Sequence, residues 1–159
     1  MEAIMKTVLY GVLAAALGAA APWVVAAEAP HGHDGHPAQL QLDHGRKWAT
    51  DEPLRSNMSA IRAVLETRLA ALHRGTLTKA DYQVIGATVE HHVGKIVTEC
   101  KLPPQADAML HLVVADLIAG ADALQGKTPT VPSTGARQVV QALDAYGAYF
   151  QHPGWQPLH

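Results

Sequence analysis

The chain has 159 residues, which is enough for one domain with a real core and too short for two. Lysine and arginine number 12 against 14 aspartate and glutamate residues, so the net charge of -2 offers no basic surface to a phosphate backbone, and nucleic acid is not expected as a partner. Aromatic residues make up 5% of the chain, which favours helices, because strands are rich in aromatic and β-branched residues.

An export signal is expected at the amino end of the chain. An apolar run begins after Lys6 and ends with the small residues Ala26 and Ala27. This pattern predicts a signal peptide over residues 1–27 that is cleaved after export, and therefore a periplasmic protein. The alternative is an uncleaved anchor, since the run approaches the roughly 20 residues of a membrane-spanning helix. Pro22 and the small residues favour cleavage.

The segment that follows, residues 28–40, is rich in histidine, glycine and proline and has no apolar period, so we expect it to be flexible. Neutral imidazoles are good ligands for copper and zinc, and glycine allows a chain to wrap around an ion. We therefore predict that His31, His33 and His36 bind copper or zinc in a capture or buffering role. The alternative is a solvated linker whose histidines are incidental.

Residues 41–159 are predicted to form one helical domain, because apolar residues recur every three to four positions along four segments. Capping residues, glycines and prolines place the limits of the helices at Thr50 or Asp51 to Gly75, Thr78 to Pro103, Pro104 to Gly126, and Ser133 or Thr134 to Pro153. The expected fold is an all-α, antiparallel up-down-up-down four-helix bundle. This topology brings together, at one end, Met58, Cys100, Met109 and His152.

A second candidate metal site lies inside the predicted bundle. His92 occupies a position on the apolar stripe of the second helix where leucine would be expected. Bundles build metal sites from inward-facing side chains, so His92, Met58 and Cys100 are predicted to form a soft site of the kind that suits Cu(I). The alternative is a core histidine satisfied by a carbonyl or carboxylate, with Met58 and Cys100 as ordinary core residues. Cys100 is the single cysteine, so it cannot form an internal disulfide.

No motif of a known enzyme class is present. The sequence has no GxSxG elbow, no glycine-rich phosphate loop, no HExxH pair and no CxxCH haem attachment. The protein is therefore predicted to be non-enzymatic. A third function is an interaction or adaptor protein, in which apolar residues of the third helix outside the core stripe, Leu112 and Ile118, contact a second copy or a periplasmic or membrane protein.

Two short segments resemble the soluble b-type cytochromes and the cytochromes c-prime, which are periplasmic four-helix bundles. Residues 54–58 (LRSNM) resemble the region that supplies an axial methionine, and residues 145–147 (AYG) resemble the region that supplies an axial histidine. The resemblance implies a haem-binding electron carrier as an alternative function. Because Gly147 stands at the histidine position, haem is not expected as the cofactor unless His92 replaces that ligand.

A wider resemblance covers most of the chain after residue 27. The chain is similar to haem-free, exported helical-bundle proteins of proteobacteria that are called DnrO-like. The residues that carry this resemblance are 45–51 (GRKWATD), 101–104 with 106–108 (KLPP and ADA), and 146–147 with 152–155 (YG and HPGW). The resemblance implies an exported helical bundle and implies no particular activity.

Overall fold

The computed structural model describes residues 39–158. The predicted signal peptide and the candidate ligands His31, His33 and His36 lie outside the described residues. These assignments and the predicted domain limits therefore stay predictions. Over residues 39–158 the chain is all-α, and its β pairing is confined to two isolated bridges. No helix in this part of the chain is long and apolar enough to cross a membrane.

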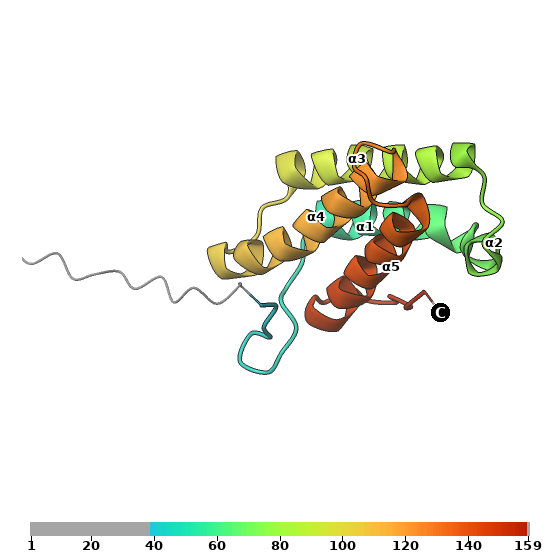
Figure 1. The fold of residues 1–159 in the computed structure, drawn as a ribbon. Helices are drawn as coiled ribbons and strands as arrows, with labels where there is room; N and C mark the ends of the chain where they lie inside the picture. Colours follow the sequence, from blue (N-terminus) through green and yellow to red (C-terminus); the bar gives the residue numbers. More distant parts are fainter. Residues whose placement is uncertain (1–38, 159) are drawn as a thin grey trace, which may run out of the picture. The chain divides into compact units, whose positions relative to one another are not determined.

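Helices form the whole regular structure of the described chain, and Figure 1 shows their arrangement. They are, in order, α1 (Glu52–Glu66), α2 (Leu69–Arg74), α3 (Lys79–Glu99), α4 (Pro104–Leu124) and α5 (Pro132–Tyr149). Helix α1 packs against α3, α3 against α4, and α4 against α5, whereas α1 and α5 meet over a short stretch. Helices α3, α4 and α5 run antiparallel to their neighbours, which confirms the predicted helical bundle in its main part.

Local sequence signals predict three helix starts correctly. Asp51 caps α1, because its Oδ1 accepts a hydrogen bond from the amide of Leu54 at 3.0 Å. Thr78 and Asp81 form a reciprocal capping box at the start of α3. Pro104 is the first residue of α4, where its missing amide hydrogen leaves no partner unsatisfied.

The start of α5 differs from the prediction. The helix begins at Pro132, and Val131 precedes it without any side-chain cap. Ser133 and Thr134 therefore lie inside the first turn, and neither of them caps the helix. Proline at the first position is preorganised for a helix because its φ angle is fixed, so α5 begins earlier than a cap at Ser133 or Thr134 would place it.

The first predicted helix is interrupted in its second half. The carbonyl of Val64 accepts hydrogen bonds from the hydroxyl of Thr67 at 3.1 Å and from the guanidinium of Arg68 at 3.2 Å. The amide of Arg68, which would bond this carbonyl in a continuous helix, bonds Leu65 at 2.9 Å. The prediction of one helix is therefore wrong, and Gly75, with φ of 65°, ends the separate α2.

Helices α4 and α5 approach each other closely at two glycines. A Cβ atom on Gly120 would lie 2.6 Å from Cγ2 of Val139, and one on Gly135 would lie 2.7 Å from Cβ of Ala123. No larger residue fits at either position, so the glycines bring the two backbones together. The largest fully buried side chains of the core come from α1, α3, α4 and α5 with the residue after it: Leu54, Met58, Ile61, Leu65, Ile85, Val89, Ile96, Leu117, Leu124, Leu143, Tyr146 and Phe150.

One end of the bundle is fastened by backbone hydrogen bonds between distant segments. The amide of Trp48 donates to the carbonyl of Tyr149 at 2.8 Å, and the amide of Gln151 donates to the carbonyl of Trp48 at 2.8 Å. Oδ2 of Asp51 accepts from the amide of Lys101 at 2.7 Å. The start of α1 therefore meets the ends of α3 and α5, as the predicted topology requires.

Candidate functional site

The side chain of His92 on α3 is oriented by a polar residue of α1. Nδ1 of His92 lies 2.8 Å from Oδ1 of Asn57. The amide nitrogen of Asn57 donates to the carbonyl of Pro53 at 2.8 Å, so its oxygen faces the imidazole and can only accept. The proton of the neutral imidazole therefore lies on Nδ1, and Nε2 carries the lone pair.

The environment of His92 favours this neutral form. Burial lowers the pKa of His92 below its usual value, and the positive charges of His91 and Lys95 lower it further. The side chain is half-buried, and Nε2 has no hydrogen-bond partner among residues 39–158. The exposed imidazole of His91 lies edge-on beside it, with 5.0 Å between the ring centroids. The arrangement presents an oriented nitrogen donor with a second imidazole nearby.

The other two predicted ligands have different surroundings. Met58, next to Asn57 on α1, is fully buried in the apolar core. Cys100 is the residue that caps the end of α3, and it is half-buried beside the carboxylate of Asp51. Within residues 39–158, no group of three or more histidine, cysteine, aspartate or glutamate side chains lies close enough to hold a metal ion.

The thiol of Cys100 is held in its protonated form. Burial raises the pKa of Cys100 to about 12, and the negative charge of the adjacent Asp51 contributes to the rise. The thiolate is the form that binds metals and attacks electrophiles. At neutral pH, Cys100 therefore carries a protonated thiol, which is a weak hydrogen-bond donor.

A second polar chain crosses the same end of the bundle. Nδ1 of His152 lies 2.9 Å from the hydroxyl of Tyr146, and its Nε2 lies 3.3 Å from Oγ of Ser59. The ring of Tyr146 is fully buried, and burial raises the pKa of its phenol. Burial, with the positive charge of Arg55, lowers the pKa of His152. Both groups are therefore neutral at pH 7.

Ser59, His152 and Tyr146 are hydrogen-bonded in the order of a hydrolytic triad. Their protons, however, lie on different atoms from those of a triad. The buried hydroxyl of Tyr146 has His152 as its one partner in the described chain, so it donates its proton to Nδ1. The ring proton of His152 then lies on Nε2 and points to Ser59. A general base needs its lone pair on the nitrogen that faces the serine. The chain of hydrogen bonds thus fixes the carboxyl end of the protein and does not activate the serine.

Position 147, where the resemblance to four-helix cytochromes places an axial histidine, is covered by an aromatic ring. A Cβ atom added to Gly147 would collide with the indole of Trp155. That indole packs edge-on against the ring of Tyr146, with 4.9 Å between centroids. The space that a haem ligand would need is therefore filled by the protein's own side chain.

Sequence reasoning missed Asn57, the residue that orients His92. A signal was present, because Asn57 lies three residues after Leu54 and one before Met58, on the buried side of α1. A polar amide on an apolar stripe needs a partner. The pairs of Asp51 with Cys100 and of Ser59 with His152 gave no local signal, since each joins residues far apart in the sequence.

Comparison with known proteins gives no match: no family model, no curated protein and no solved structure is similar to this chain. The resemblances to the DnrO-like proteins and to the cytochromes therefore stay predictions.

Proposed function

We propose that the chain is an exported, non-enzymatic protein that binds copper or zinc and captures or buffers the ion. In this proposal His31, His33 and His36 are the main ligands, and the imidazole of His92 is a separate, weaker point of attachment on the bundle. The observation that carries the second part is the hydrogen bond from Nδ1 of His92 to Asn57.

This hydrogen bond is the kind of support that metal-binding histidines receive. A ligating imidazole usually donates its remaining N–H to a carbonyl, carboxylate or water, which fixes the tautomer and the ring orientation. Asn57 fills this role for His92, and it is itself held by Pro53. The ring of His91 lies edge-on beside His92, with 5.0 Å between the ring centroids. Met58 is fully buried in the apolar core and Cys100 lies beside Asp51, so the proposal assigns the weaker site to the imidazole of His92.

The remaining parts of the proposal concern architecture and location. We place α1 and α2 together as the first leg of an up-down-up-down four-helix bundle, with α3, α4 and α5 as the other three. A periplasmic location after cleavage of residues 1–27 fits a capture role, because a histidine-rich segment then lies near the new amino terminus. The metal ion is the partner, and a second copy or an envelope protein is the alternative partner.

Metal titration tests the proposal directly. Zinc and, separately, copper are titrated into the purified chain from residue 28 onward by calorimetry, and into a variant in which His31, His33 and His36 are alanine. We expect binding tighter than about 10 µM that the triple variant loses. If neither form binds more tightly than this, the proposed function is wrong.

Imidazole nitrogen resonances test the part played by His92. Zinc is expected to shift the Nε2 resonance of His92 and to leave its Nδ1 proton in place. The variant His92→Gln should lose the weaker binding phase, while His111→Gln, at an exposed position on α4, should keep it. Loss of the phase in both variants, or no shift of Nε2, would remove His92 from the proposal and leave the histidine-rich segment as the site.

A further inference from the structure

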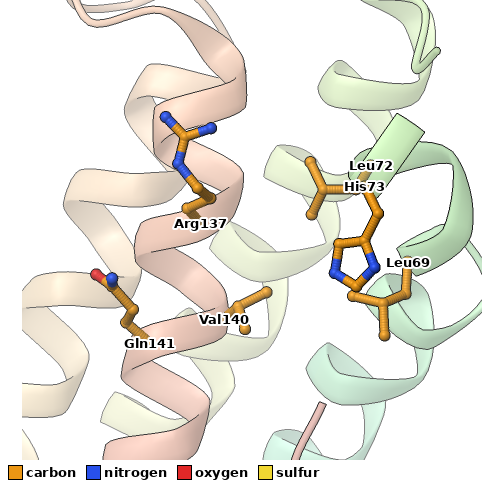
Figure 2. A pocket seen from close by; sticks show the side chains of 6 residues that line it. All are labelled: Leu69, Leu72, His73, Arg137, Val140 and Gln141. Carbon is orange, nitrogen blue, oxygen red and sulfur yellow. The ribbon is translucent and has the colours of Figure 1, made fainter. Parts of the chain in front are cut away.

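An open groove runs between α2 and α5. It exists because α1 and α5 meet over a short stretch and the chain is interrupted before α2, which has no buried residue. The groove has a volume of about 370 Å³, within the range of small-molecule sites. Its lining comes from both helices, as Figure 2 shows: Leu69, Leu72 and His73 on α2, and Arg137, Val140 and Gln141 on α5.

The floor of the groove is apolar. Leu69 and Leu72 from α2 and Val140 from α5 are half-buried, and all three pack against the edge of the core. They leave part of their side chains uncovered where the two helices diverge. An aliphatic group in the groove would cover this surface and so remove apolar area from water, which favours binding.

The guanidinium of Arg137 marks one end of the groove, whereas the ring of His73 lies toward Leu69 (Figure 2). Figure 2 shows Arg137 at the same end as Leu72, with Val140 and Gln141 toward Leu69. The guanidinium of Arg137 donates to the hydroxyl of Thr134 at 2.9 Å. Among residues 39–158, neither Arg137 nor His73 forms an ion pair with a carboxylate, and neither does the neighbouring Arg74.

We infer that this groove binds an amphiphilic carboxylate, with its aliphatic chain on the apolar floor and its carboxylate at the end of the groove marked by Arg137. A guanidinium binds a carboxylate through two parallel hydrogen bonds, and Arg137 has donors to spare. Two acids limit where the anion is placed: Asp116 lines the neighbouring groove beyond Arg137, and Asp144 follows Val140 by one turn of α5. The binding does not depend on the proposed metal function.

Calorimetry with three ligands of equal chain length tests this inference. Decanoate, decanol and decyltrimethylammonium are titrated at submicellar concentration into the purified chain from residue 28 onward, without metal. We expect decanoate to bind with a dissociation constant below about 1 mM and the other two to bind at least about tenfold more weakly. Arg137→Gln should weaken decanoate binding by about tenfold and leave decanol unchanged.

Matched variants separate the charge from the apolar floor. Arg46→Gln removes an equal charge from an exposed turn away from the groove and should leave decanoate binding unchanged. Val140→Asp should weaken the binding of decanoate and of decanol alike. If circular dichroism shows that this variant is unfolded, Leu69→Gln is used in its place. Any of three results would overturn the inference. Decanoate could fail to bind with a dissociation constant below about 1 mM, it could bind Arg137→Gln as tightly as the wild type, or the cationic ligand could bind as tightly as decanoate. If the chain binds zinc but fails these tests, only the inference about the groove is overturned, and the proposed metal function is unaffected.

Discussion

The amide oxygen of Asn57 accepts a hydrogen bond from Nδ1 of His92 at 2.8 Å, across the interface of α1 and α3. Asn57→Ala removes the acceptor for His92 and the donor to Pro53 together. We expect a loss of about 1–3 kcal/mol in the free energy of unfolding, because half-buried polar groups lose their partners. Urea denaturation measures this loss, and Ser56→Ala, at the exposed neighbouring position, should have little effect.

The same pair predicts the metal affinity of His92. Loss of a supporting hydrogen bond weakens metal binding by roughly 10- to 100-fold. The variant Asn57→Asp should have the opposite effect and strengthen zinc binding. A carboxylate beside Nδ1 raises the pKa of His92 and so makes Nε2 a better donor to the metal. Zinc titration monitored by the Nε2 resonance of His92 measures both changes. Equal zinc affinity in the wild type and Asn57→Ala would contradict the role assigned to Asn57.

Two glycine substitutions are expected to have opposite effects on stability. Gly147→Ala places a Cβ against the half-buried indole of Trp155, so the ring must shift, and overpacking of this kind costs about 1–3 kcal/mol. Gly94→Ala on α3 meets nothing within 4 Å, so it should stabilise the protein by about 0.5–1 kcal/mol through the helix propensity of alanine. Thermal denaturation compares the two, and a stabilised Gly147→Ala would show that the indole is free to move.

The pairing of Asp51 with Cys100 predicts how the thiol titrates. The rate of alkylation by iodoacetamide follows the thiolate, so the folded protein should react slowly up to pH 9, since the pKa of Cys100 is raised to about 12. Asp51→Asn keeps a capping side chain on α1 and removes the charge, so the midpoint of the pH profile should fall. Glu99→Gln should lower it less, because Glu99 contributes less to the shift. An equal shift in both variants would contradict this explanation.

His152 is expected to make the stability depend on pH. Its pKa is lower in the folded protein than in the unfolded chain, so the unfolded chain binds more protons as the pH falls. The stabilising contribution is complete above a pH of about 6.5 and is lost as the pH falls from there toward the folded pKa. Urea denaturation between pH 7.5 and 5.5 should show this decline. It should be reduced in His152→Gln and unchanged in the exposed control His111→Gln, and an unchanged slope in both would refute the assignment.

Much of the fold follows from local signals in the sequence. The capping box of Thr78 and Asp81 and the proline at position 104 are decided by neighbouring residues, so the pattern predicts them correctly. The interruption before α2 was not predictable in this way. The apolar spacing of Leu65, Leu69 and Leu72 continues through it, and the helix ends because two side chains compete for one carbonyl.

For the candidate site, the sequence predicts which residues lie near one another and does not predict their chemistry. Antiparallel topology brings Cys100 and His152 to one end of the bundle, and the structure places both there, beside Asp51 and Ser59 of the first helix region. Their chemistry was not predictable. The pKa of a thiol depends on burial and on a carboxylate far away in the sequence, and neither is visible in a pattern of neighbours.

The backbone pairing of Trp48 with Tyr149 and Gln151 has a consequence for biosynthesis. The partners of Trp48 are synthesised after α1 to α4, so this end of the bundle cannot close until α5 has been made. Closure of this end therefore depends on residues that follow it by most of the length of the bundle. Deleting the residues after α5 should leave the segment around Trp48 undocked even in a chain whose helices form.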